Sequence, residues 1–328
     1  MRVRNDPVFT GPFAPLCEAF VKQKRAIGVQ YNGQIWILRR FDKFAKDFNI
    51  QENIVSKELA SAWAKKSPNE STSHYNNRLY VMWRFADFLV QQGYDSYLKR
   101  FKLRRNSKHT PYVFTKDEMR KIFAELDKME YSPHSPIKHK AYPVLYRMLY
   151  GCGLRISEAL SLTVKDVDIE NRMLHIVMGK NDKERLVPMS ASLTQHCFSL
   201  IAETSRNHGS SHLLFYSRDG KPYGVSNIEK HFRSLLWDIG IPYHGRELGP
   251  RLHDIRHTFV CHRLNDWAKS GVDLMTGLPV LSKYLGHENV AGTAWYLKLT
   301  AEVYPDVIEK VNALAGHIFP EVGGEYIE

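Results

Sequence analysis

The sequence predicts a mainly α-helical protein with a small antiparallel β-sheet, built as two domains that form a clamp. Its 328 residues suffice for two domains of roughly 100–200 residues each. Along most of the chain apolar residues recur every three or four positions, as in amphipathic helices. Residues 165–189 instead alternate with a period of two, which is typical of a β-hairpin.

The first domain is predicted to span residues 1–98 and to be entirely helical. Apolar spacing indicates helices over residues 11–29, 32–49, 56–66 and 73–92. One stripe of the last helix is expected to face the core, with Arg78 and Arg84 turned elsewhere. The stripe consists of Tyr75, Leu79, Met82, Phe85 and Leu89.

The excess positive charge of the chain lies in its first third. Residues 1–110 carry 20 Lys and Arg against 9 Asp and Glu, whereas the remainder is balanced at 26 against 26. A solvated basic face would explain this composition. A polyanion-binding surface would explain it equally well, because clustered cations gain affinity by releasing counterions from phosphates.

Residues 99–110 are predicted to be a basic linker between the domains. They contain six cations and no acid, and stretched out they could reach roughly 40 Å. We expect this linker to run along a nucleic-acid backbone, the alternative being a merely flexible tether. The expected DNA contacts are Lys99, Arg100, Lys102, Arg104, Arg105 and Lys108.

The second domain, residues 111–300, is predicted to combine helices with the hairpin. Thr115-Lys-Asp-Glu118 is a capping-box pattern that starts a helix. Strands over residues 173–178 and 185–189 flank the charged turn 179–183. The other predicted helices span residues 141–150, 190–204, 225–239, 252–267, 279–285 and 290–297, with a loop over 267–278 and a tail helix over 301–315.

The turn Gly151-Cys-Gly153 ends an apolar helix and presents Arg155. It does not complete a G-x-G-x-x-G dinucleotide pattern, because Ile156 stands at the last glycine position. A guanidinium flanked by apolar helices needs an anionic partner. That partner is either Glu158 or a ligand.

Composition excludes several classes of protein. No apolar run approaches the roughly 18 residues of a membrane span, and the first residues lack the apolar segment of a signal peptide. The four cysteines are widely scattered, which favours reduced thiols in a cytoplasmic protein. We expect no metal, no cofactor and no membrane partner.

The stretch 252–296 gathers groups suited to an anionic phosphate. His253 and Arg256 lie three residues apart and share a helix face, and the Arg155 fork matches paired phosphate oxygens. Tyr296 is the expected nucleophile, and His253 could accept its proton. Lys180 could supply a proton to the leaving oxygen, and His287 an additional donor. Taken singly, each residue also has an ordinary structural explanation.

Four motifs in order resemble those of the tyrosine recombinase (phage integrase) family. They are G-L-R-I-S-E, G-K-x-x-K-x-R-x-V-P, H-D-I-R-H-T-F, and L-G-H followed nine residues later by Tyr. The resemblance implies catalytic roles for Arg155, Lys180, His253, Arg256, His287 and Tyr296. Glu158, the candidate partner of Arg155, is expected to support them. Within this pattern His253, and not His257 or His262, occupies the motif position. The turn lacks a second glycine common in the family, which leaves Lys183 as an alternative to Lys180.

The resemblance further implies a site-specific recombinase that acts on double-stranded DNA. Members of the family join a tyrosine to a 3′ phosphate, and two such rounds proceed through a Holliday junction in a tetramer on two sites. They need no metal or cofactor and exchange a C-terminal segment, here 301–328, between protomers. An accessory protein or second recombinase is possible. Integration, excision, inversion, transposition and dimer resolution all stay open.

Two other functions compete with recombination. A type IB topoisomerase shares the chemistry but only relaxes supercoils, and a DNA-binding protein could retain a vestigial centre. The two-domain layout and the motif wording favour a recombinase, and the presence of all six candidate residues argues against a vestigial centre.

The charge distribution leads to a first testable prediction. DNA affinity should depend mainly on residues 1–110 and should fall steeply between roughly 50 and 200 mM salt. Fluorescence anisotropy with labelled duplexes would compare the whole chain with the fragment 111–328. Equal affinity of the fragment would contradict the polyanion interpretation.

Overall fold

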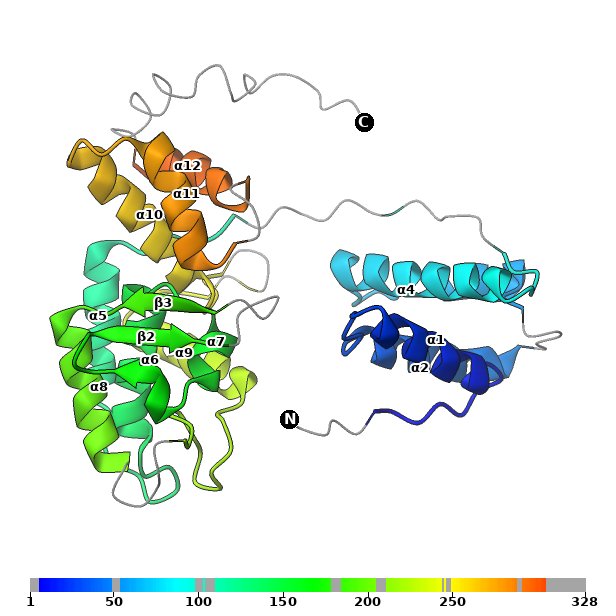
Figure 1. Ribbon diagram of the computed structural model, residues 1–328, viewed down its shortest axis with the longest axis horizontal. Helices are drawn as coiled ribbons and strands as arrows, with labels where there is room; N and C mark the ends of the chain where they lie inside the picture. Colours follow the sequence, from blue (N-terminus) through cyan, green and yellow to red (C-terminus); the bar gives the residue numbers. More distant parts are fainter. Residues whose placement is uncertain are drawn as a thin grey trace. The chain divides into compact units, whose positions relative to one another are not determined.

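The computed structural model describes residues 6–48, 54–97, 103, 110–177, 184–204, 211–243, 245, 249–287 and 291–304. The chain divides into two compact units, Met1–Lys108 and His109–Glu328 (Figure 1). Lys180, Lys183 and the six cations named in the linker lie outside the described residues, as do residues 305–328. The proposed DNA contacts, hairpin lysine and protomer exchange therefore stay predictions.

The first unit is helical, as the apolar spacing predicts. Its helices α1, α2 and α4 pack against one another, with Ser56 and Ser71 capping α3 and α4 through their side-chain oxygens. The predicted stripe of α4 is buried in the core of this unit. The elements are α1 (Ala14–Ala26), α2 (Gln34–Phe44), the short 3-10 helix η1 (Ala45–Asp47), α3 (Lys57–Trp63) and α4 (Thr72–Gln91).

Arg78 does not point away from the core, and that expectation was wrong. Its side chain is only 7% exposed and donates from Nε and Nη2 to the Glu70 carboxylate at 2.6 and 2.8 Å. The guanidinium also lies over the rings of Trp63 and Tyr75. A buried carboxylate and two aromatic faces replace the water that an arginine would otherwise require.

The larger part of the second unit consists of a small sheet and the helices that pack around it (Figure 1). The three strands are antiparallel in the order β1-β2-β3. Leu174 pairs with Val187, and both side chains are buried. Both bonds of the predicted capping box at Thr115 form. The elements are α5 (Lys116–Asp127), α6 (Lys138–Gly151), α7 (Ile156–Ser161), η2 (Val164–Asp166), β1 (Val167–Asp168), β2 (Met173–Ile176), β3 (Arg185–Pro188), α8 (Ala191–Thr204) and α9 (Val225–Asp238).

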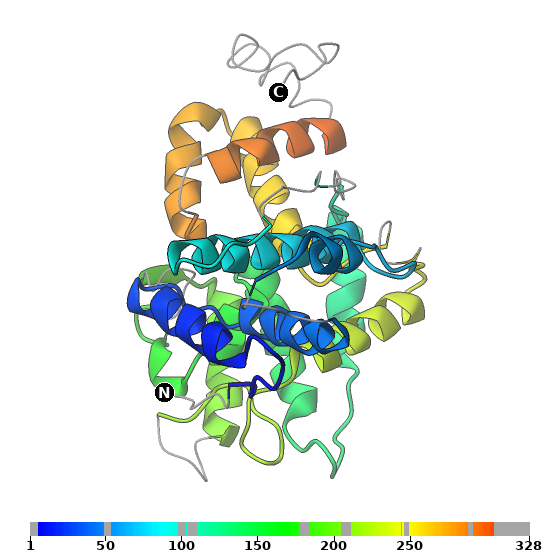
Figure 2. The ribbon, with the colours of Figure 1, turned by 90° about the vertical axis from the view of Figure 1, so that its right-hand side faces the viewer.

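Three further helices form a second hydrophobic cluster at one end of this unit. They are α10 (Asp254–Lys269), α11 (Leu274–Leu285) and α12 (Ala291–Val303). Helix α12 packs against both α10 and α11 (Figure 2). The cluster contains the side chain of Tyr296.

The predicted loop over residues 267–278 is mostly helical. Helix α10 continues to Lys269, and α11 begins at Leu274 rather than near Pro279. The Asp273 side chain accepts hydrogen bonds from the backbone of Met275 and Thr276, which fixes this earlier start. Pro279 lies within the second turn of α11. Because proline has no backbone N–H, the helix loses a single hydrogen bond there.

No helix in the described part of the chain is long and apolar enough to cross a membrane.

The buried pair in the first unit gives a prediction for stability. Hydrogen bonds from Arg78 hold the pKa of Glu70 at about 2, below its ordinary value of 4.5. A carboxylate with a depressed pKa stabilises the fold fully above its unfolded pKa, and this contribution disappears as the pH falls towards 2. Glu70→Gln should therefore cost on the order of 3 kcal/mol at pH 7.

Urea unfolding at pH 7 and at a pH of about 3 would test this difference, which linkage predicts to shrink at the lower pH. Glu18→Gln, at an exposed position on α1, is the matched control and should change little. An equal loss from both substitutions at pH 7 would contradict the assignment.

Candidate active site

Arg155 stands at the start of α7 because the chain turns sharply after α6. Gly153 has φ of +59°, a left-handed backbone conformation that favours glycine. A Cβ there would also lie 2.4 Å from the Phe259 ring, so both the backbone and the space around it exclude a side chain. Glu158 then caps α7, accepting from the Arg155 backbone N–H at 2.9 Å and from Nη1 at 2.8 Å. Glu158 is thus one partner of Arg155. Because the Arg155 side chain remains 22% exposed, it can also contact a ligand anion.

Arg256 is the third residue of α10 and is buried. Its Nη1 donates to the Gly153 carbonyl at 2.5 Å, and its Nη2 donates to the Leu285 carbonyl at 2.7 Å. Nη1 also lies 3.9 Å from a Glu158 oxygen. Arg256 therefore joins the turn after α6 to the end of α11.

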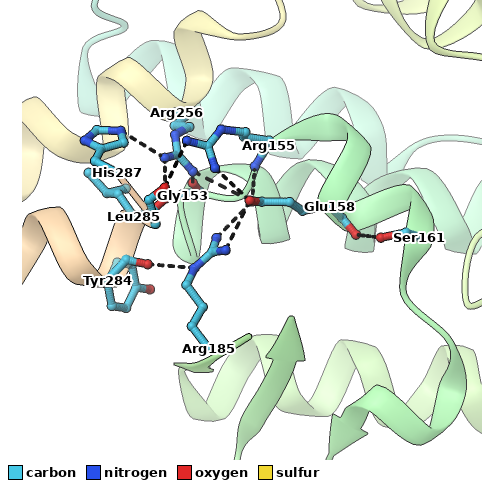
Figure 3. A network of polar contacts seen from close by, with 10 residues as sticks. Gly153, Arg155, Glu158, Ser161, Arg185, Arg256, Tyr284, Leu285 and His287 are labelled. Carbon is cyan, nitrogen blue, oxygen red and sulfur yellow. Dashed lines mark hydrogen bonds and ion pairs between the residues drawn. The ribbon is translucent and has the colours of Figure 1, made fainter. Parts of the chain in front are cut away.

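Arg185, at the start of β3, is a third arginine in this centre (Figure 3). Its two terminal nitrogens donate to the two Glu158 oxygens at 3.1 and 2.9 Å, and its Nε donates to the Tyr284 carbonyl at 2.8 Å. No role was predicted for Arg185 from the sequence. The available signal was its place in the G-K-x-x-K-x-R-x-V-P motif.

The C-terminal end of α11 accepts a hydrogen bond from each of these arginines. Tyr284 accepts from Arg185, Leu285 from Arg256, and Gly286 from Arg155 at 3.4 Å. These are carbonyls that a helix end leaves without intrahelical partners, and they carry partial negative charge. The arginines are consequently held between one carboxylate and one helix end.

The centre keeps a net positive charge for an anion. Burial opposes ionisation of Glu158, but hydrogen bonds from Arg185 and Arg155 outweigh it and lower the pKa of the carboxyl. Burial, reinforced by Arg155, lowers the pKa of Arg256 to about 10, which still leaves it protonated at pH 7. Among the described residues of this hydrogen-bonded centre, the Glu158 carboxylate thus faces the three guanidiniums of Arg155, Arg185 and Arg256.

His287 follows Gly286, whose left-handed backbone ends α11. Burial and the neighbouring Arg256 lower the pKa of His287 to about 4, so the ring is neutral at pH 7. Since Arg256 can only donate, His287 Nε2 accepts from it at 3.2 Å. Nδ1 therefore carries the proton and donates to Thr293 Oγ1 at 2.7 Å.

Tyr296 lies on α12 and is 4% exposed. Its ring is parallel to that of His287, with centroids 6.3 Å apart and planes at 9°. Its hydroxyl forms a hydrogen bond of 2.7 Å with His257 Nδ1. Burial raises the pKa of this phenol to about 12, although Arg256 and Arg155 pull it downwards.

His253 is the residue that immediately precedes α10. Burial and Arg256 lower its pKa to about 4, so this imidazole is neutral at pH 7. Its ring meets that of His257 edge-on, with centroids 4.7 Å apart. The hydrogen-bond partner that the structure gives Tyr296 is therefore His257, one turn along the helix from the residue expected from the motif.

The structure thus brings together Arg155, Glu158, His253, Arg256, His287 and Tyr296, which all line one centre. The sequence pattern of the phage integrase family matches residues 112–302, more than half of the chain. The chain belongs to the phage integrase family.

The similarity of this integrase to two relatives extends beyond the segment that the family pattern matches. The putative integrase/recombinase y4rB of Sinorhizobium fredii is 31% identical over 317 residues, which cover 92% of this chain and 97% of the relative. The tyrosine recombinase XerA of Thermococcus onnurineus is 28% identical over 229 residues, covering 69% and 72%.

Among solved structures, the Tn1549 transposon integrase in complex with transposon right end DNA has a TM-score of 0.62 to this chain. It is 20% identical, and the match covers 86% of this chain and 94% of that one, which shows a shared fold. With the family and the relatives together, this integrase is a tyrosine site-specific recombinase.

Within the described residues of the integrase, no group of three or more His, Cys, Asp or Glu side chains could hold a metal ion. Asp166 accepts hydrogen bonds from Thr163, and Asp168, in β1, accepts them from Asn171.

The arginine centre makes a prediction about Arg185. Arg185→Lys keeps the charge but cannot hold both Glu158 oxygens and the Tyr284 carbonyl with one planar fork. Recombination between two cognate sites should slow by about tenfold or more if the Glu158 carboxylate loses its orientation, a cost of about 1.4 kcal/mol. Arg120→Lys, at an exposed ion pair on α5, is the matched control.

A double-mutant cycle with Glu158→Gln would measure whether the two residues act together. Contacting partners should show a coupling of about 0.5–3 kcal/mol. Strictly additive losses would mean that Arg185 acts independently of Glu158.

Proposed function

We propose that this recombinase cuts DNA by attack of Tyr296 on a backbone phosphate, forming a 3′-phosphotyrosyl bond and releasing a 5′ hydroxyl. One observation carries the proposal. The Tyr296 hydroxyl is fixed by a hydrogen bond at 2.7 Å on a ring that stacks on His287, which is itself bonded to Arg256. A phenol is thereby placed next to cations suited to a phosphate.

The arginines supply the electrostatic part of the mechanism. Charge accumulates on the non-bridging oxygens as the phosphorus becomes pentacoordinate, and preorganised guanidiniums stabilise it. Arg155 is the most accessible of the three, with 22% exposure against 2% for Arg256 and 11% for Arg185. Arg155 and Arg256 are therefore proposed to bind the phosphate, with Glu158 and Arg185 holding them in place.

The remaining groups are assigned to proton positions. His287 Nε2 accepts from Arg256, and a bound phosphate is proposed to take over that arginine donor. His253, neutral and beside Arg256, is proposed as a further donor or acceptor at the phosphate. Lys180, or alternatively Lys183, is proposed to protonate the leaving 5′ oxygen.

The first unit is proposed to bind double-stranded DNA together with the linker. The net charge of residues 1–110 supports this assignment, as does the Tn1549 integrase of similar fold, which is in complex with transposon right end DNA. The proposed domains are a core-binding domain over residues 1–98, the linker 99–110, and the catalytic domain 111–300. The proposed linker contacts are Lys99, Arg100, Lys102, Arg104, Arg105 and Lys108.

Rejoining is proposed to reverse the cleavage chemistry with the 5′ hydroxyl of a partner strand. Because the phosphotyrosyl bond conserves the energy of the broken phosphodiester, no high-energy cofactor is required. Two rounds in a homotetramer would pass through a Holliday junction, with residues 301–328 exchanged between protomers. Four protomers are implied because two sites, each with two strands, undergo four cleavages.

Replacing the nucleophile tests the proposal directly. A nicked suicide duplex, which traps the covalent intermediate by losing a short strand, should give a protein–DNA adduct with the wild-type chain. Tyr296→Phe removes one oxygen and should abolish that adduct, while DNA affinity stays within about twofold, because no phosphate contact is lost.

Tyr304→Phe, on the segment following α12, provides a control that leaves the Tyr296 hydroxyl intact. An adduct that survives Tyr296→Phe would refute the assignment.

A supercoiled plasmid with two sites gives a further readout, in which resolved circles indicate recombination and relaxed circles alone indicate topoisomerase activity.

A further inference from the structure

The hydrogen bond between His257 and Tyr296 lies outside the roles assigned so far. His257 is on the second turn of α10, and its Nδ1 is 2.7 Å from the hydroxyl that is proposed to attack. The two rings are 5.4 Å apart between centroids. This contact joins the helix that carries Arg256 to the helix that carries the nucleophile.

Tyr296 contacts two histidines, one through its ring and one through its hydroxyl. His287 stacks on the ring and is bonded to Arg256, which links the ring to the arginine centre. His257 takes the hydroxyl itself, and the Trp295 ring packs edge-on against His257 at 5.9 Å. His257 therefore contacts the hydroxyl oxygen, whereas His287 links the Tyr296 ring to Arg256.

His253 is less well placed to accept that proton. It contacts His257 edge-on, with ring centroids 4.7 Å apart. Since residues four apart in a helix share a face, both imidazoles line the same side of α10. Of the two, His257 is the one within hydrogen-bonding distance of the reacting oxygen.

We propose that His257 is a further catalytic residue, which accepts the phenolic proton of Tyr296 during strand cleavage. This rests on the proposed role of Tyr296 as nucleophile. The O–H bond breaks as the bond from oxygen to phosphorus forms, and the proton moves to Nδ1. The bond from phosphorus to the 5′ oxygen breaks, and that oxygen takes a proton from the hairpin lysine. Rejoining returns both protons.

The need for an acceptor follows from the burial of the nucleophile. With its pKa at about 12, the phenol is almost entirely protonated at neutral pH. A general base within hydrogen-bonding distance typically accelerates such a step by about 100-fold to 10,000-fold. The positive charge formed on His257 is balanced by the negative charge that the phosphate acquires.

His257→Asn is the sharpest substitution to test this. The asparagine oxygen can replace Nδ1 as a hydrogen-bond acceptor but is too weak a base to take the proton. Adduct formation on the suicide duplex should slow by about 100-fold or more. His262→Asn is the matched control, because His262 lies on the same helix and its Nδ1 bonds the Tyr150 hydroxyl at 2.8 Å, away from the nucleophile.

A more acidic nucleophile separates proton transfer from positioning. Trifluorotyrosine at position 296, introduced by codon reassignment, carries a far more acidic phenol and should reduce the effect of His257→Asn to under about tenfold, because its proton is much easier to remove without a base. If the defect persists in full with this residue, His257 only positions the phenol and the proposal is wrong. A near-normal rate of His257→Asn with natural Tyr296 would also overturn it.

A substrate with sulfur at the 5′ bridging position distinguishes base from acid. Sulfur leaves without a proton, so the His257→Asn defect should remain, and its disappearance would make His257 the acid instead. If circular dichroism shows that His257→Asn does not fold, His257→Gln is measured in its place. The same two probes, trifluorotyrosine at position 296 and the 5′-sulfur substrate, then decide between the outcomes. Failure of the proposed function itself would appear separately, as an adduct that persists in Tyr296→Phe.

Discussion

The organisation of the site depends on one carboxylate that binds several guanidiniums. Glu158 accepts from Arg155 and Arg185 and lies within 3.9 Å of Arg256, while the end of α11 accepts from the same three arginines. Repulsion between buried guanidiniums would otherwise drive them apart. The carboxylate and the helix end hold them at fixed positions and still leave a positive excess.

The parts of this structure that follow local rules were predictable. Apolar periodicity gave the helices of the first unit, and the pattern at Thr115 gave a capping box that the structure contains. The change to a period of two gave the hairpin. The position of Arg155 followed from the Gly151–Gly153 turn, because a glycine with positive φ redirects the chain within three residues.

What the sequence did not give are contacts between elements remote along the chain. Arg78 looked like a surface residue because its partner Glu70 and the rings around it depend on how α3 meets α4. Arg185 acquires its role from Glu158, 27 residues away, and from α11. The start of α11 was missed because Pro279 suggested a helix boundary, whereas the cap at Asp273 determined it. His257 carried a signal, its spacing of four from His253, but the motif directed attention to a single histidine.

The two chemical halves of the site belong to different packing clusters. Leu154 and Ala159, which flank Arg155 and Glu158, are part of the core around the sheet, whereas Tyr296 belongs to the cluster of α10, α11 and α12. Local unfolding proceeds in cooperative units of this size. A fluctuation that loosens α12 therefore moves Tyr296 while the core around the sheet, which adjoins Arg155 and Glu158, stays folded. Under the proposed mechanism such a fluctuation separates phosphate binding from strand cleavage, because Arg155 adjoins one core and Tyr296 belongs to the other.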